Sequence, residues 1–206
     1  TYCEEIDVTE LILLREAAKK RVLKKTGAKL SYMPFLVKAI LPALEEFPLL
    51  NASLDEETEE VVFHSMKNVG IAVDTPPGLV VPVVHDADKK TVVELNTEIT
   101  EMAERARAGK TRQEDLGGGT FTISNAGNIG GVMATPIINV PEVAILGVHA
   151  MRPRPWVVDD EIVIRDIMWL SLSLDHRVVD GGVGAHAMNR IKELIENPAL
   201  LLLEED

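Results

Sequence analysis

Apolar side chains that recur every three or four residues predict four helices along the chain. The first follows Asp7, which together with Glu10 resembles a capping box, an arrangement in which side chains satisfy the free N–H groups at a helix start. The second starts near Ser31 and runs to Phe47-Pro48. Pro42 lies inside this second helix and predicts a kink there, because proline removes one N–H donor from the helix.

The third and fourth helices carry clearer start signals. Thr91 and Glu94 form a capping box, and the helix that follows is expected to end near Gly109. Its buried stripe consists of Val92, Leu95, Ile99, Met102 and Ala106. The fourth helix begins at about Gly181, and Asp180 is placed to cap it.

Short runs of β-branched and apolar residues predict the strands. They cover residues 61–63, 69–73, 79–84, 120–124, 143–148, 162–164 and 169–174. In the last run leucines alternate with serines, a period of two that is typical of a strand with one buried face. Helices and strands are mixed and the late strands follow one another. We therefore expect an α/β (α+β) fold with a mixed or antiparallel sheet flanked by helices.

Composition narrows the class of protein. The 206 residues are 46% hydrophobic and 26% charged, and no linker or repeat divides them, so we expect one globular domain over 1–206. A net charge of -12 argues against nucleic-acid binding, which relies on Lys and Arg at phosphates. No run approaches ~20 apolar residues, so we expect no membrane span. The lone Cys3 excludes an intrachain disulfide, and its acidic surroundings disfavour a reactive thiolate.

The chain offers little for a metal or a nucleotide. Its five histidines are scattered, and neither a Cys pair nor an H-E-x-x-H pattern accompanies them, so we expect no metal site. The glycine-rich stretch 117–131 lacks both G-x-x-x-x-G-K-[ST] and a helix-opening G-x-G-x-x-G. Tight turns and close backbone approach are the simpler roles for these glycines.

Two positions are candidates for chemistry. His176 directly follows the alternating strand in the pattern His-x-x-x-Asp-Gly, and a strand end is a rigid platform for a catalytic side chain. The alternative is a polar turn with an exposed histidine. Ser124 ends the strand over 120–124, where a hydroxyl bonded to backbone is the alternative to a catalytic group.

Together these positions belong to a wider set of motifs. The most specific segments are FTISNAGNIGG, TPIINVPEVAILGV, SLSLDHRVVDG and ENPALLLLEED. Upstream of them stand KLSYMPFLVKAI, EEFPLLNASLD and NVGIAVDTPPGLVVPVV. The set resembles the catalytic domain of the dihydrolipoamide acyltransferases, the core components of the 2-oxo acid dehydrogenase complexes, and it covers essentially the whole chain. The His-x-x-x-Asp-Gly pattern alone is shared with chloramphenicol acetyltransferase and with peptide-synthetase condensation domains.

The resemblance implies an acyl transfer between dihydrolipoamide and coenzyme A. It assigns His176 as the general base on the coenzyme A thiol and Ser124 as the donor to the tetrahedral oxyanion. Asp180 would orient the histidine loop, and Gly181 would allow its turn. Asn125 could support Ser124.

Coenzyme A carries phosphates, so cations should line one mouth of the site. Lys38, Arg152 and Arg154 are available, and the sequence does not choose among them. The stretch 119–158 that holds Ser124 contains Glu142 against two arginines, so it is nearly neutral although the whole chain is acidic.

The resemblance also implies a chloramphenicol-acetyltransferase-like fold and a homotrimer with active sites between subunits. Trimers would assemble into a cubic or dodecahedral core that serves the decarboxylase and dihydrolipoamide dehydrogenase components. We expect the tail Leu200–Leu203 to dock into an adjacent trimer, with packing inside its own subunit as the alternative. Family members carry lipoyl and subunit-binding domains, which do not fit in this chain. A lipoyl domain elsewhere would then supply the lipoyl group.

The sequence leaves alternatives open for the function and for the acyl group. A non-catalytic scaffold of the same fold and a chloramphenicol-type acetyltransferase are the competing functions. For the acyl group, FPLLNASLD favours a branched chain, GVHAMRPRP favours succinyl, and GLVVPVV fits acetyl. The expected location is the cytoplasm, or the mitochondrial matrix in a eukaryote. The chain starts at Thr1 rather than Met, which is typical of a fragment.

Overall fold

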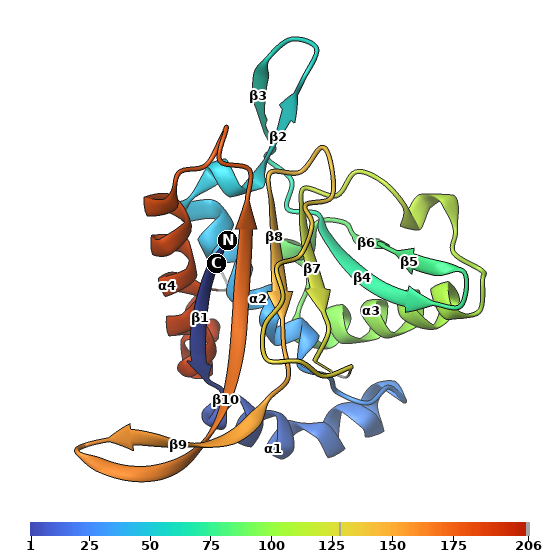
Figure 1. Ribbon diagram of the computed structural model, residues 1–206. Coiled ribbons are helices and arrows are strands. Elements are labelled where there is room, and N and C mark those ends of the chain that lie inside the picture. The colour runs from blue at the N-terminus through green and yellow to red at the C-terminus, as the bar shows by residue number, and fades with distance from the viewer. Residues whose placement is uncertain (128, 205–206) are drawn as a thin grey trace.

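The computed structural model describes residues 1–127 and 129–204. Its main element is an eight-stranded mixed sheet with the strand order β1-β10-β8-β7-β4-β5, in which β6 also pairs with β4 and β9 pairs with β10 (Figure 1). The pairs β4–β7 and β7–β8 are parallel, and the other pairs are antiparallel. The strands are β1 (Tyr2–Asp7), β4 (Val69–Thr75), β5 (Gly78–Val80), β6 (Val83–Val84), β7 (Phe121–Asn125), β8 (Ala144–Val148), β9 (Arg152–Val158) and β10 (Glu161–Leu174).

Helices cover one face of this sheet. They are α1 (Thr9–Thr26), α2 (Met33–Glu46), α3 (Val92–Arg107) and α4 (Gly181–Glu196). Figure 1 shows α2, α3 and α4 behind the sheet, with α1 across the end to which β7 points. A separate two-stranded hairpin, β2 (Ala52–Asp55) with β3 (Glu60–Phe63), projects beyond the opposite end. The expected mixed sheet flanked by helices is confirmed.

Period-two alternation decides which side chains meet the helices. Phe121 and Ile123 of β7 are fully buried in the core between sheet and helices. Thr122 and Ser124 therefore point to the opposite face, which carries no helix. The polar residues of the motif thus lie on the face that is open to a loop or a partner.

The third and fourth helices start as predicted. Thr91 and Glu94 form a complete capping box on α3, and the Asp180 carboxylate accepts the Val183 N–H at 2.8 Å as the N-cap of α4. The second helix begins at Met33, close to the expected start near Ser31, and ends before its C-cap Phe47, as predicted.

Several expectations about individual elements were wrong. The single strand expected over 79–84 is two short strands, β5 and β6, with Val81 and Pro82 between them. Asp7 does not cap α1, because it is the last residue of the unpredicted strand β1; Val8 is the N-cap, although the Asp7 carboxylate accepts the Thr9 N–H. The separate strands at 162–164 and 169–174 are one 14-residue strand, β10. Its partner β9 contains Pro153 and Pro155 and was not expected, yet prolines fit an edge strand whose free N–H side faces away from the sheet.

Candidate active site

His176 lies in a tight turn between β10 and α4, and its side chain is exposed. The residue before it anchors this turn: the Asp175 N–H donates to the Val143 carbonyl at 2.8 Å, which ties the loop to the start of β8. Asp180 closes the turn by capping α4. The histidine is therefore presented to solvent by a backbone that is held at both ends.

Ser124 is half-buried near the end of β7, on the face without helices. It pairs in register with Ala72 of β4 and with Gly147 of β8, and Gly147 pairs in turn with Ser171 of β10. Small residues thus flank Ser124 along this row of the sheet, and the His149 ring and Pro136 lie close over Gly147.

The structure does not bring His176 and Ser124 together within one chain. Ser124 shares its row with Ser171, and His176 stands five residues farther along the chain from Ser171. The strand β10 continues for three residues beyond Ser171 before the turn, which at ~3.3 Å per residue is about 10 Å along the sheet, with two strand spacings of ~4.8 Å across it. Figure 1 shows that the two strands end in opposite directions, β10 toward the β2–β3 hairpin and β7 toward α1.

A cavity of about 710 Å³ lies beside the end of β7; it is lined by residues of α1, α2 and α3 and by Asn125, but not by Ser124. Asn125 lines it and is fixed in place, because its amide oxygen accepts the Gly127 N–H at 2.9 Å and its amide nitrogen contacts the Met33 sulfur at 3.3 Å. Arg15 and Arg107 bring two cations to its wall, where Glu104 and Asp166 bring two carboxylates, and Arg15 lies 4.8 Å over the Tyr32 ring. Sequence reasoning missed these residues, because they come from segments far from the motif.

A second histidine also lines this cavity and was missed as a site residue. His149 is buried, and its Nε2 lies 2.9 Å from the Ser171 hydroxyl, which donates to the Ala134 carbonyl at 2.7 Å. Burial lowers the pKa of His149. The only sequence signal was its place two residues after Gly147, on the same face of the sheet as Ser124.

The other candidate residues lie apart from this cavity. Gly181 is the first residue of α4 and is exposed. Arg152 begins β9 and is exposed, and Arg154 pairs with Glu5 on β1. Lys38 lies on α2 in a different groove, described below. Among the residues that the structure describes, no three His, Cys, Asp or Glu side chains form a group that could hold a metal ion.

A buried carboxyl stands just before β8. Glu142 is 4% exposed, Asn139 donates to its Oε1 at 3.1 Å, and burial raises the pKa of the carboxyl. The folded protein therefore keeps this proton to a higher pH than the unfolded chain, so Glu142 costs stability only above the unfolded pKa of ~4.3.

Replacing Glu142 by glutamine is expected to remove this cost. Relative to the parent protein, the Glu142→Gln thermal midpoint should rise as the pH increases from about 4 and then level off above the raised pKa. Thermal unfolding of both proteins across a pH series measures the difference. A constant difference at every pH would contradict the assignment.

Similar proteins are known over the whole length of the chain. The family described as 2-oxoacid dehydrogenases acyltransferase (catalytic domain) matches residues 1–203. A dihydrolipoyllysine-residue acetyltransferase component of pyruvate dehydrogenase complex from Staphylococcus epidermidis is 49% identical over 204 residues, which are 99% of this chain and 47% of that protein. The chain thus spans about half the length of the curated relatives it matches.

Solved structures agree with this similarity. A dihydrolipoamide acetyltransferase from Azotobacter vinelandii superposes with a TM-score of 0.92 at 40% identity, covering 98% of this chain and 82% of that chain. A structure of the cubic core of the pyruvate dehydrogenase multienzyme complex gives the same values. A chloramphenicol acetyltransferase matches with a TM-score of 0.53 at 13% identity, over 95% of this chain and 85% of that one, which confirms the expected fold. No helix among the described residues is long and apolar enough to cross a membrane.

Proposed function

This chain belongs to the family of 2-oxoacid dehydrogenase acyltransferase catalytic domains, and from that premise we propose that it transfers an acyl group between S-acyl-dihydrolipoamide and coenzyme A. The observation that carries the proposal is the pair His176 and Ser124. Each lies at an open end of the sheet, inside the segments that carry the family motifs. The relatives of known structure include a core of a multienzyme complex, so a scaffold role accompanies the catalytic one.

His176 supplies the base that the reaction needs. A thiol has a pKa near ~8.5, so only a few per cent of coenzyme A is thiolate at neutral pH. The imidazole of His176 takes the thiol proton as the sulfur attacks the thioester carbonyl. The imidazolium then returns the proton to the dihydrolipoamide sulfur when the carbon–sulfur bond breaks. One thioester replaces another, so the reaction runs readily in both directions.

Ser124 stabilises the charge that develops between these two steps. The tetrahedral intermediate carries an oxyanion, and the Ser124 hydroxyl donates a hydrogen bond to it. Asp180 acts through structure alone in this scheme, since its carboxylate caps α4 behind the histidine.

Two copies of the chain complete one site. The offset of ~10 Å along the sheet, together with two strand spacings across it, keeps His176 away from Ser124 of its own chain. A neighbouring copy in a trimer therefore supplies the histidine that faces Ser124. This arrangement gives the exposed side chain of His176 a binding surface that the single subunit lacks.

The cavity beside Asn125 is the site we propose for coenzyme A. Arg15 and Arg107 offer charge to its phosphates, and the Tyr32 ring holds the Arg15 guanidinium over its face. These residues take precedence over Lys38 and Arg152, which lie elsewhere. The lipoyl group is carried into the site by a lipoyl domain.

Acetyl is the acyl group that the names of the relatives support. Turnover with acetyl-, isobutyryl- and succinyl-dihydrolipoamide in parallel tests this choice and the proposed activity together. Acetyl should give the highest kcat/KM. Absence of transfer from all three, with the assembly intact, would favour the scaffold, and acetylation of chloramphenicol would favour the antibiotic-modifying alternative.

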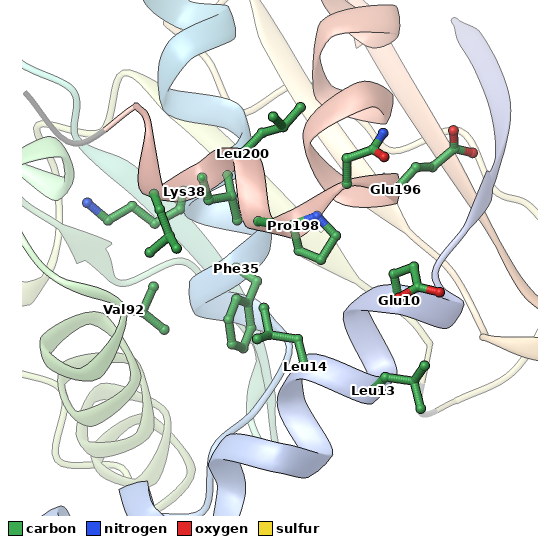
Figure 2. Close-up of a pocket in the computed structure, with 13 residues that line it drawn as sticks. Glu10, Leu13, Leu14, Phe35, Lys38, Val92, Glu196, Pro198 and Leu200 are labelled. Atoms are coloured by element: carbon green, nitrogen blue, oxygen red, sulfur yellow. The ribbon is translucent and has the colours of Figure 1, made fainter.

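The tail and a nearby groove suggest how trimers join. The 3-10 turn η4 (Pro198–Leu202) borders a groove of about 730 Å³ between α1 and α2, in which Figure 2 shows Leu13, Leu14 and Phe35. Leu202 and Leu203 remain 75% and 74% exposed beside it. A surface that carries both an apolar groove and exposed leucines can pair with a copy of itself about a two-fold axis.

A double change of Leu202 and Leu203 to serine is expected to leave trimers that no longer form a larger core, because it removes the exposed apolar contact. Sedimentation velocity measures the particle size. Leu201, which is only 7% exposed and packs in its own subunit, gives the contrast: Leu201→Ser should lower the thermal midpoint of the trimer itself. A full-size particle from the double variant would rule out tail docking.

The decarboxylase and dihydrolipoamide dehydrogenase components are the proposed partners of this core. A cytoplasmic location belongs to the same proposal, in keeping with the bacterial sources of the curated relatives.

A further inference from the structure

We propose that Asp175 and Arg177 form a positioning unit for His176, and that Glu56 of the β2–β3 hairpin extends this unit to a second element. The inference rests on the proposed function, since it assigns roles around the proposed base. The pattern His-x-x-x-Asp-Gly includes neither Asp175 nor Arg177, and Glu56 lies 120 positions upstream of His176 in the acidic hairpin.

Asp175 and Arg177, the two neighbours of His176 in the chain, are joined by hydrogen bonds. The Arg177 guanidinium donates from Nη2 to Asp175 Oδ2 at 2.7 Å and from Nε to Asp175 Oδ1 at 3.0 Å. The Arg177 backbone N–H also donates to Asp175 Oδ1 at 3.0 Å. His176 therefore sits inside a small ring closed by charge-assisted hydrogen bonds, which restricts its backbone while its side chain stays exposed.

Asp175 is also the structural centre of the turn. Its carbonyl accepts the N–H groups of Val178 and Val179 at 3.0 and 2.9 Å, and its own N–H donates to Val143. The Arg177 hydrogen bonds hold the pKa of the Asp175 carboxyl below its usual range, so the carboxylate stays charged at neutral pH.

Glu56 connects this turn to the hairpin. Arg177 Nη1 donates to Glu56 Oε1 at 3.0 Å, and both side chains are largely exposed. An exposed ion pair adds little to the free energy of unfolding. We therefore expect Glu56 to act by orienting the Arg177 guanidinium. We expect a smaller contribution from Glu56 than from Asp175.

The pair also balances charge beside the base. With both residues present, the carboxylate of Asp175 and the guanidinium of Arg177 cancel next to His176. Glu56 and Asp180 are the other charged groups that the structure places around this loop, and they stay unchanged in the key variants. Loss of Arg177 leaves a net negative charge that favours imidazolium, whereas loss of the Asp175 charge leaves a net positive one.

Three variants test the unit: Arg177→Gln, the isosteric Asp175→Asn, and the two combined. Each single change should lower kcat by about tenfold with KM nearly unchanged, because a misaligned base affects the proton transfer. The acid limb of the pH profile should move up in Arg177→Gln and down in Asp175→Asn, by about half a unit each, and return in the combined variant. Glu56→Gln should lower kcat by about twofold.

A second readout does not depend on turnover. The pH dependence of diethyl pyrocarbonate modification at His176, followed by peptide mass spectrometry, should show the same opposite shifts. Arg112→Gln is the matched control, since the Arg112 guanidinium donates two hydrogen bonds to the Asp115 carboxylate and forms an ion pair with Glu114, outside the histidine loop. Unshifted His176 modification in both single variants would overturn the positioning unit. Absence of acyl transfer by the parent protein would instead overturn the proposed function, while the modification of His176 could still be measured.

Discussion

Replacement of His176 by alanine is expected to lower acyl transfer to coenzyme A by about 10²–10⁴-fold, the usual contribution of a general base. Without imidazole, the thiol must lose its proton to water, and the departing dihydrolipoamide sulfur receives none from the protein. The loss should therefore appear mainly in kcat. Transfer from acetyl-dihydrolipoamide at saturating coenzyme A measures it directly.

The result is specific only if the assembly survives. His176 is exposed in a turn that is held by hydrogen bonds of its neighbours and of the backbone, so its removal should leave the particle size unchanged. His186→Ala serves as the matched control, because His186 is an equally exposed histidine ten residues along, on α4. Full activity in His176→Ala, or an equal loss in His186→Ala, would refute the assignment of the base.

Local patterns predicted those elements whose signals are complete within a few residues. The capping box of Thr91 and Glu94 needs only its own helix, and the Asp180 cap needs only the next turn. Strand β1 shows the limit: its sequence YCEEID carries three acidic residues and no clear alternation. It is a strand because β10 offers it an edge, with Tyr2 opposite Leu172 and Asp7 opposite Ile167. That pairing joins residues about 170 and 160 positions apart, which no local pattern can report.

The candidate site likewise contains residues that a local motif predicts and residues that only the fold brings together. His176 and Ser124 were found because each lies in a compact motif at a strand end. Arg15, Tyr32 and His149 reach the cavity beside Asn125 from three separate segments, and only the sheet register and the helix packing bring them there. Taken alone, each of these three side chains is explained by an ordinary position at the surface or in the core. Spatial convergence, rather than residue type, marks them as functional candidates.

Replacement of Ser124 by alanine is expected to lower kcat by about 10²–10³-fold, the typical effect of losing one oxyanion donor. KM should change little, because the hydroxyl acts on the charge that develops after substrate binding. Ser173→Ala is the matched control, a serine on the same face of the sheet whose hydroxyl contacts Thr1 at 3.0 Å. A fall in affinity without a fall in kcat would assign Ser124 to substrate binding instead.

The two inactive variants together test the geometry of the site. If each site takes His176 from one chain and Ser124 from its neighbour, trimers refolded from equal amounts of His176→Ala and Ser124→Ala chains contain some sites with both groups intact. Such a site takes its histidine from a Ser124→Ala chain and its serine from a His176→Ala chain, so about one site in four is complete. The mixture should recover about a quarter of the parent activity, while the variants assayed separately and then pooled without refolding should recover none. A site built within one chain is never complete in either variant. Failure of the refolded mixture to regain activity would therefore place His176 and Ser124 of one site in the same subunit and contradict their separation along the sheet.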